Sequence, residues 1–228
     1  MSLFLAPRLS STPADAELAA LNDRFENLAA GAVIRWAVET FGERLAIASS
    51  VQDAVLIDIA VRIDPGIEVV FVDTGEHFPE TLETLERVRQ RYALNLRVVR
   101  VPTPPVPFPV ADPVMCCSAA KVAALDGALD GKLAWMSGLR RCEAPSRANA
   151  PILSRDRRGL IKINPLVHWS DADIAGYIAD HDVPYNPLLD QGYPSIGCAP
   201  CTRPVAPGEH PRSGRWAGVE KTECGIHL

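Results

Sequence analysis

The sequence lacks any apolar run long enough to cross a membrane, and it has no excess of positive charge. A spanning helix needs about 20 consecutive, mainly apolar residues. The formal net charge of -5 argues against a general nucleic-acid-binding protein. The N-terminal residues carry no basic region before a long apolar core, so no signal peptide is expected. These absences predict a cytoplasmic protein without membrane or nucleic-acid partners.

Cysteine is scarce, but its placement is informative. Cys116 and Cys117 are adjacent, Cys198 and Cys201 form a C-x-x-C pair, and Cys224 lies in a polar C-terminal tail. In the reducing cytosol, paired cysteines are more typical of metal binding or catalysis than of disulfides. Four thiolates suit an iron–sulfur cluster or structural zinc, and adjacency favours the cluster, because zinc sites usually separate paired ligands. A tail thiol suits a nucleophile.

Strands and helices alternate along the chain. Apolar runs predict strands at residues 45–48, 67–72, 96–101, 133–137 and 161–166, and helices are expected at 54–62, 79–91 and 170–180. Residues 15–41 fit two helices separated at Gly31. The alternation predicts an open, mostly parallel α/β sheet of five or six strands with helices on both faces. We expect one domain over residues 1–204 and a mobile tail over 205–228.

Two polar loops follow the first two predicted strands. The candidate substrate-binding residues in them are Ser49, Ser50, Gln52 and Asp53 in the first loop, and Asp73, Thr74 and Gly75 in the second. Hydroxyls and backbone N–H groups at a helix N-terminus favour phosphate or sulfate, and open α/β sheets bind ligands at this edge. Each loop alone also fits a simple helix cap or turn. The first lacks the paired glycines of an ATP-hydrolysing phosphate loop.

Arginines are concentrated in two segments of this acidic chain. Six lie between residues 140 and 158, and others lie in the tail. A guanidinium group binds phosphate or sulfate oxygens bidentately. The candidate anion-binding residues of these segments are Gly138, Arg140, Arg141, Arg212 and Arg215. Arg155, Arg157 and Arg158 are more typical of solvated surface charges.

Together these features resemble the assimilatory adenosine 5′-phosphosulfate reductases, the cluster-containing branch of the phosphosulfate reductase family. The resemblance extends from about residue 45 to the C-terminus. Its motifs are Cys116-Cys117-x-x-x-Lys121, Gly138-x-Arg140-Arg141, Cys198-x-x-Cys201-Thr202-Arg203-Pro204, Arg212-x-Gly214-Arg215-Trp216 and Glu223-Cys224-Gly225-Ile226-His227. It implies an adenine nucleotide alpha hydrolase-like fold.

The resemblance implies a cofactor, a substrate and a mechanism. A [4Fe–4S] cluster would be held by Cys116, Cys117, Cys198 and Cys201. Adenosine 5′-phosphosulfate would bind with its phosphosulfate on Lys121 and the arginines. The Cys224 thiolate would attack the sulfate sulfur, AMP would leave, and thioredoxin or a glutaredoxin-like reductant would release sulfite from the S-sulfocysteine, in assimilation toward cysteine. A homo-oligomer is also expected.

Three other functions remain open at this stage. The closest is reduction of the 3′-phosphorylated substrate, which some cluster-containing relatives accept. The others are an ATP-dependent adenylating or thiolating enzyme with a zinc site, and a non-catalytic zinc-stabilised binding domain. Cys142 is a departure from many relatives, and we predict that it is dispensable. A resting disulfide between Cys142 and Cys224 is the rival hypothesis.

Overall fold

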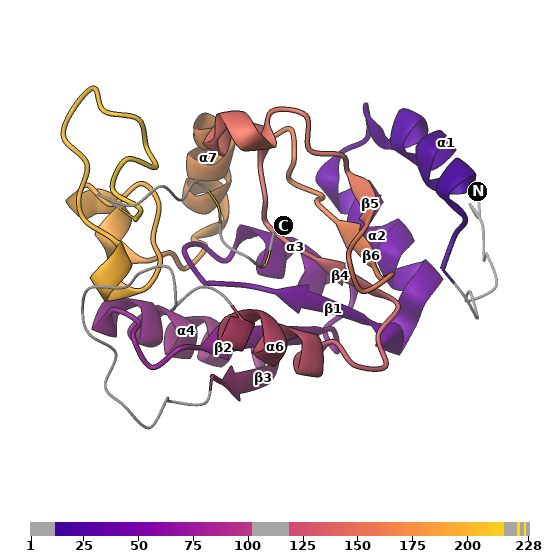
Figure 1. Cartoon of the computed structure of the whole chain (residues 1–228), viewed down its shortest axis with the longest axis horizontal. Coiled ribbons are helices and arrows are strands. Elements are labelled where there is room, and N and C mark those ends of the chain that lie inside the picture. The colour runs from indigo at the N-terminus through magenta and orange to yellow at the C-terminus, as the bar shows by residue number, and fades with distance from the viewer. Residues whose placement is uncertain (1–11, 102–118, 217–222, 224–225, 227–228) are drawn as a thin grey trace.

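The computed structural model describes residues 12–101, 119–216, 223 and 226, and a six-stranded sheet forms its centre (Figure 1). The strands are β1 (Leu45–Ala48), β2 (Glu68–Asp73), β3 (Asn95–Arg100), β4 (Ala134–Met136), β5 (Leu153–Arg155) and β6 (Ile161–Ile163). Their order is β3-β2-β1-β4-β6-β5, and β5 pairs antiparallel to β6 while the other pairings are parallel. The strand order reverses between β1 and β4, which makes this the topological switch point.

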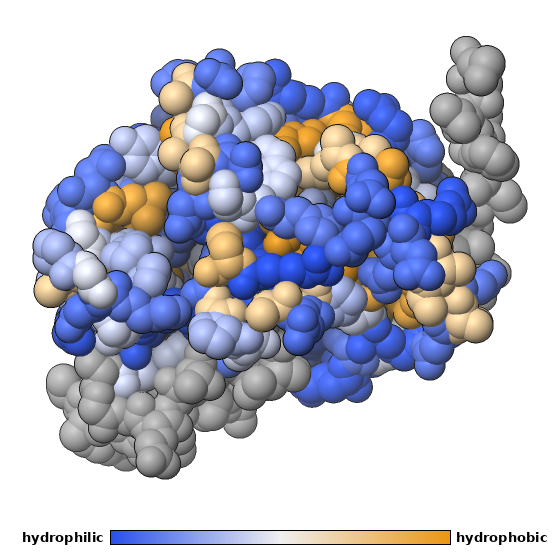
Figure 2. Space-filling model, turned by 90° about the horizontal axis from the view of Figure 1, so that it is seen from above, coloured by the Kyte–Doolittle hydropathy of each residue, from blue (hydrophilic) through white to orange (hydrophobic). Residues whose placement is uncertain are grey.

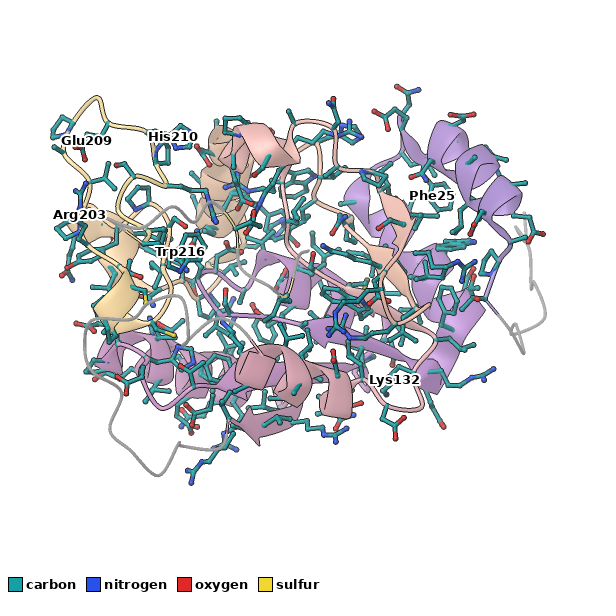
Figure 3. The ribbon with its side chains drawn as sticks, in the orientation of Figure 1. Phe25, Lys132, Arg203, Glu209, His210 and Trp216 are labelled. Carbon is teal, nitrogen blue, oxygen red and sulfur yellow. The ribbon has the colours of Figure 1, made fainter. Side chains whose placement is uncertain are left out.

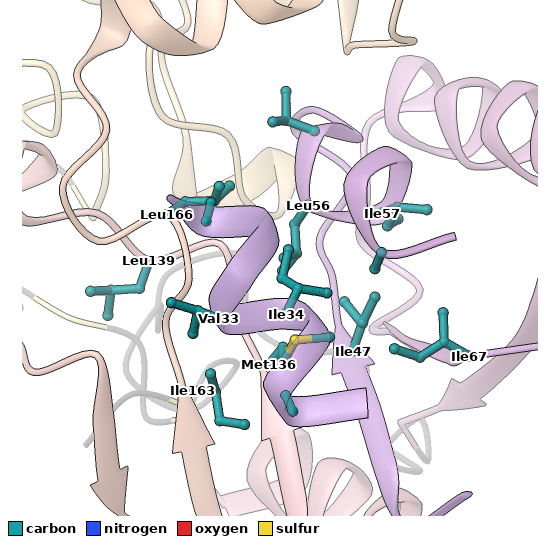
Figure 4. Close-up of a cluster of buried hydrophobic side chains, with 14 of the residues drawn as sticks. Val33, Ile34, Ile47, Leu56, Ile57, Ile67, Met136, Leu139, Ile163 and Leu166 are labelled. Carbon is teal, nitrogen blue, oxygen red and sulfur yellow. The ribbon is translucent and has the colours of Figure 1, made fainter. Parts of the chain in front are cut away.

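Helices cover both faces of the sheet. They are α1 (Asp15–Phe25), α2 (Ala30–Phe41), α3 (Val55–Ile63), α4 (Pro79–Tyr92), α6 (Ala119–Ala128) and α7 (Asp171–His181). The larger apolar cluster lies between the sheet and α2 and α3, where Ile34, Ile47 and Met136 are buried (Figure 4). On the opposite face Trp135 packs with Leu125 of α6. Adjacent residues of β4 thus enter different clusters, as the alternation of side chains along a strand requires.

The sequence predictions of these elements are largely confirmed. Ser170 caps α7, because its hydroxyl accepts a hydrogen bond from the Asp173 N–H at 3.1 Å, and Pro79 begins α4. The break predicted at Gly31 is wrong: the two helices are separated at residues 26–29, and Gly31 lies in the first turn of α2. A glycine near a helix start costs little where packing supplies the stability.

The region after α7 is irregular and packs against the carboxyl ends of the strands. It contains two short 3₁₀ turns, η4 (Pro187–Gln191) and η5 (Ala199–Cys201). Isolated bridges join Asp53 to Tyr185 and His77 to Cys198, so this region contacts the loops that follow β1 and β2. In Figure 1 it is the orange and yellow segment beside α7.

Hydrophilic side chains dominate the face of the molecule seen in Figure 2, and hydrophobic side chains form separate patches on it. None of the described helices is both long and apolar enough to cross a membrane. The exposed large apolar side chains among the described residues include Leu28, Leu82 and Val98. Single exposed apolar side chains of this kind are normal on a folded protein.

Candidate functional site

A cavity of about 200 Å³ lies at the carboxyl ends of β1, β2 and β4, at the switch point of the sheet. This is the position at which open α/β sheets bind ligands. The sequence-predicted residues that line it are Ser49, Ser50, Gln52, Asp53, Lys121, Gly138, Arg140, Arg212 and Arg215. The fold therefore brings residues from four separate segments of the chain to one cavity.

The loop after β1 is held in place by its own side chains. Ser49 accepts a hydrogen bond from the Val51 N–H at 3.1 Å, and Val51 has the left-handed φ of 49°. Asp53 accepts a hydrogen bond at 3.0 Å from the N–H of Val55, the first residue of α3. Burial raises the pKa of the Asp53 carboxyl, although the bond from Val55 acts in the opposite direction. Ser50 is exposed and lines the cavity.

Gln52 connects this loop to the C-terminal region. Its side-chain oxygen accepts a hydrogen bond from the Ile196 N–H at 2.9 Å, and its backbone carbonyl accepts one from Asn186 at 2.9 Å. The polar atoms of Gln52 thus fix the wall of the cavity that Ser195 and Ile196 form. This contact spans more than 140 positions of the sequence.

The loop after β2 faces a different neighbour. Asp73, Thr74 and Gly75 are not among the described residues that line the cavity. Asp73 accepts a hydrogen bond from the Gly75 N–H at 2.9 Å, and the φ of +75° at Gly75 is a conformation that glycine adopts without strain. The Thr74 hydroxyl lies 3.1 Å from the Cys198 sulfur. This turn contacts the C-x-x-C pair.

The adjacent arginines after β4 have different environments. Arg140 is buried, lines the cavity and donates to Asp171 at 2.8 Å. Burial opposes the charge of Arg140, but Asp171 and Glu143 outweigh it and raise the pKa of the guanidinium. Arg141 does not line the cavity; it donates to the Ala150 carbonyl at 2.8 Å and to Glu26 at 2.7 Å. These contacts join the loop after β4 to residues outside the cavity.

Two arginines of the C-terminal region lie close to the buried ring of Trp216, the residue labelled in Figure 3. The guanidinium carbon of Arg212 lies 5.3 Å from the ring centroid and that of Arg215 lies 4.5 Å from it. Burial lowers the pKa of Arg212. Arg215 donates weakly to Ser195 and Ile196, and its buried Nε has no hydrogen-bond partner among the described residues. An unpartnered guanidinium N–H at a cavity favours an anionic ligand.

Sequence reasoning missed three charged residues of this cavity. Glu143, Arg147 and Glu223 all line it. Arg147 and Glu223 are both 8% exposed, and the Arg147 Nε and Nη2 each donate to the Glu223 carboxylate at 2.7 Å. Arg147 also pairs with Glu143, and Arg212 donates to Glu223 at 3.1 Å. The arginine-rich segment was a signal for Arg147, but nothing in the sequence reveals a partner 76 positions away.

The cysteine pair that the structure describes is buried. Cys198 and Cys201 are 2% and 5% exposed. Cys198 precedes the η5 turn and Cys201 is its last residue, and the Cys201 N–H donates to the Cys198 carbonyl at 3.0 Å. Cys116, Cys117 and Cys224 lie outside the described residues. Among the residues that the structure does describe, no group of three or more His, Cys, Asp or Glu side chains is arranged to hold a metal. The four-cysteine set stays a prediction.

The sixth cysteine lies apart from this pair. Cys142 is exposed, and its sulfur contacts the Trp169 carbonyl at 3.3 Å. Burial of the thiol raises its pKa, while Arg140 acts in the opposite direction. A raised pKa lowers the thiolate fraction at neutral pH, which is unfavourable for a nucleophile.

Comparisons with known proteins identify the family of this chain. The model of the phosphoadenosine phosphosulfate reductase domain matches residues 44–204. A Rhodococcus erythropolis protein named adenosine 5′-phosphosulfate reductase is 46% identical, over 86% of this chain and 87% of its own. A Streptomyces coelicolor protein of the same name is 45% identical, over 92% and 95%.

Solved structures agree with the fold. The phosphoadenylyl-sulfate reductase of Candida auris, in a phosphate complex, superposes with a TM-score of 0.73 at 27% identity, covering 84% of this chain and 98% of that one. The Candida glabrata FMN adenylyltransferase, at 15% identity and a TM-score of 0.60, shares the fold. The open, mostly parallel sheet predicted from the sequence is therefore confirmed. The extent of the domain match and the similarity of the curated relatives show that this chain belongs to the phosphoadenosine phosphosulfate reductase family.

Proposed function

We propose that this chain reduces adenosine 5′-phosphosulfate to sulfite and AMP. The carrying observation is that Lys121, Arg212 and Arg215 line one cavity with the serine loop of β1. Cationic side chains beside hydroxyls suit a ligand that carries two adjacent anionic groups. Curated relatives of closely similar length are named for this reaction. A cytoplasmic location suits the chemistry, because thiols stay reduced there.

The reaction proposed for Cys224 is a sulfur transfer. Its thiolate attacks the sulfate sulfur, a new S–S bond forms, and the bond from sulfur to the phosphate oxygen of AMP breaks. AMP leaves with the electron pair, and the enzyme carries an S-sulfocysteine. A dithiol reductant of the thioredoxin type then attacks Cys224, sulfite leaves, and the two electrons come from the reductant.

The cations of the cavity reduce the electrostatic repulsion between the two anions that react in this step. An anionic thiolate must approach an anionic sulfate, so positive charge is needed where the two meet. Arg215 supplies a buried N–H that no described residue accepts, and Lys121 of α6 lines the same cavity. AMP is a good leaving group, because its phosphate is a weak base.

The cysteine pair fits an iron–sulfur cofactor. Cys198 and Cys201 place two thiols at one short turn next to Thr74, whose hydroxyl lies 3.1 Å from the Cys198 sulfur. Hydroxyl contacts to sulfur are one means by which proteins tune such clusters. Under this proposal Cys116 and Cys117 supply the other two thiolates. When bound, the cluster would supply charge that positions or polarises the substrate.

The decisive experiment measures turnover with both nucleotide substrates. Purified protein, thioredoxin and adenosine 5′-phosphosulfate should yield sulfite and AMP, and Cys224→Ser should yield neither. The rival substrate is the 3′-phosphorylated compound, which the name of the Candida auris relative favours. A higher kcat/KM for that compound would replace the proposed substrate, and no sulfite from either would overturn the function.

A further inference from the structure

The carboxylate of Glu223 is the best-anchored acidic group of the C-terminal tail among the described residues. It accepts two hydrogen bonds of 2.7 Å from Arg147 and one of 3.1 Å from Arg212. Its side chain and that of Arg147 are both more than nine-tenths buried. A bidentate guanidinium–carboxylate pair is geometrically specific, and removing one partner leaves the other charge buried. This pair therefore fixes the tail at one defined point.

Arg147 is itself held in place, which makes it a rigid anchor. It forms a second ion pair with Glu143, and Glu143 lies 3.5 Å from Arg140. Both ends of the Arg147 guanidinium are thus occupied by protein carboxylates. Glu223 lines the cavity without filling it. The Nε of Arg215, which also lines the cavity, has no hydrogen-bond partner among the described residues. The main anchor of the tail, Arg147, is therefore not the group whose N–H is left for a ligand, Arg215, whereas Arg212 contacts Glu223 and also lines the cavity.

A second contact lies three positions further along the tail. Ile226 also lines the cavity and packs against the apolar cluster that contains Leu125 and Trp135. Glu223 and Ile226 are the residues on either side of Cys224 and Gly225. Successive Cα atoms are about 3.8 Å apart, so anchoring both residues limits how far Cys224 can move from the cavity.

We propose that Glu223 is a positioning residue that docks the tail onto Arg147 and Arg212 and thereby holds the Cys224 thiol at the substrate cavity. The proposal rests on the proposed function of Cys224. The contact is selective, because a tail in which Glu223 is misplaced would leave buried charges unpaired.

The sharpest test replaces Glu223 by glutamine, which keeps the shape and removes the charge. In a single turnover without reductant, intact mass spectrometry measures the rate of S-sulfocysteine formation. Loss of a hydrogen-bonded charge pair predicts a rate roughly 10- to 100-fold below that of the wild type. Substrate affinity, measured by calorimetry with Cys224→Ser and with the Cys224→Ser, Glu223→Gln double variant, should be the same. Glu223→Asp should recover part of the rate.

Two controls separate positioning from a general effect. Glu209→Gln removes a carboxylate from the same region, where Glu209 contacts Arg203 and Ser213 at the periphery of the molecule (Figure 3), and it should keep the wild-type rate. Combining Glu223→Gln with Arg147→Gln should be no slower than Arg147→Gln alone, because the two residues act as one unit. Amide hydrogen exchange of the peptide over residues 217–228 should be faster in Glu223→Gln than in Glu209→Gln.

The outcomes distinguish a failure of the docking role of Glu223 from a failure of the proposed function. An unchanged rate and unchanged exchange in Glu223→Gln would overturn the docking role. Tighter substrate binding in the double variant would also overturn it, and would show that the carboxylate competes with the substrate for the arginines. If the wild type forms no S-sulfocysteine, the proposed function fails, while the exchange experiment still decides whether Glu223 anchors the tail.

Discussion

Replacing Gly197 by alanine should disturb the cavity through Arg215 while the fold stays intact. A Cβ at position 197 would lie 2.5 Å from the guanidinium carbon of Arg215, about 1 Å inside ordinary carbon–carbon contact. The guanidinium must therefore move by about 1 Å, which is enough to break its hydrogen bonds of 3.4 Å to Ser195 and 3.2 Å to Ile196. Gly197 does not have a positive φ, so alanine fits its backbone.

The displaced guanidinium should lose its bond to the anionic substrate. A hydrogen bond to a charged group contributes about 1.5–3 kcal/mol, which corresponds to a decrease in kcat/KM of roughly 10- to 150-fold. Sulfite release at low substrate concentration measures this change, and thermal unfolding tests that the fold is retained. Gly176→Ala in α7 is the matched control, because a Cβ there meets nothing within 4 Å. Wild-type kcat/KM in Gly197→Ala would refute the reasoning.

Three further predictions concern the thiols and a buried lysine. Cys198→Ser should remove the brown colour and the iron of anaerobically purified protein, as shown by absorption and metal analysis; a colourless wild type loaded with zinc would contradict the cluster. Cys142→Ser should leave sulfite formation unchanged, and loss of activity with an intact cluster would show that a second thiol is needed. Burial, assisted by Arg147, lowers the pKa of Lys162 to about 8 from 10.5. The unfolded chain binds more protons between these pH values, so the stability of the wild type relative to Lys162→Met should rise across that range by at most about 3 kcal/mol. Urea unfolding at several pH values measures this difference, and a flat difference would contradict the lowered pKa.

The strands of the sheet were predictable because most of them are apolar runs between turns. β5 (Leu153–Arg155) was missed because, unlike the equally short β4 and β6, it does not lie in a longer apolar run: its last two residues are a serine and an arginine. It joins the sheet by an antiparallel pairing with β6. The polar loops after β1 and β2 were both expected at one edge, yet Gln52 enters the cavity wall whereas Thr74 contacts Cys198.

The arginines show what sequence spacing cannot resolve. Arg140 has an extended backbone, with φ −125° and ψ 145°, whereas Arg141 is the first residue of a short 3₁₀ turn, Arg141–Glu143. The backbone changes conformation between the two residues, and their side chains reach different neighbours. The sequence analysis predicted that Arg141 binds the anion, whereas in the structure its side chain donates to Glu26. Arg155 and Arg157 are exposed, as expected, but the side chain of Arg158 is 11% exposed and pairs with Asp126 and Asp156. Only the tertiary contacts show which of these arginines faces the cavity, which is exposed and which is buried in an ion pair.

The two guanidiniums near Trp216 also provide an optical probe of the cavity. The Trp216 ring is 3% exposed and lies within 5.3 Å of the guanidinium carbons of both Arg212 and Arg215. The field of a nearby cation acts on the electrons of an indole ring, so an anion that arrives at these arginines alters the environment of the ring. The intrinsic fluorescence of Trp216 can therefore report ligand binding without a label, once the signal of the other three tryptophans, of which Trp135 also lines the cavity, is subtracted with a Trp216→Phe variant.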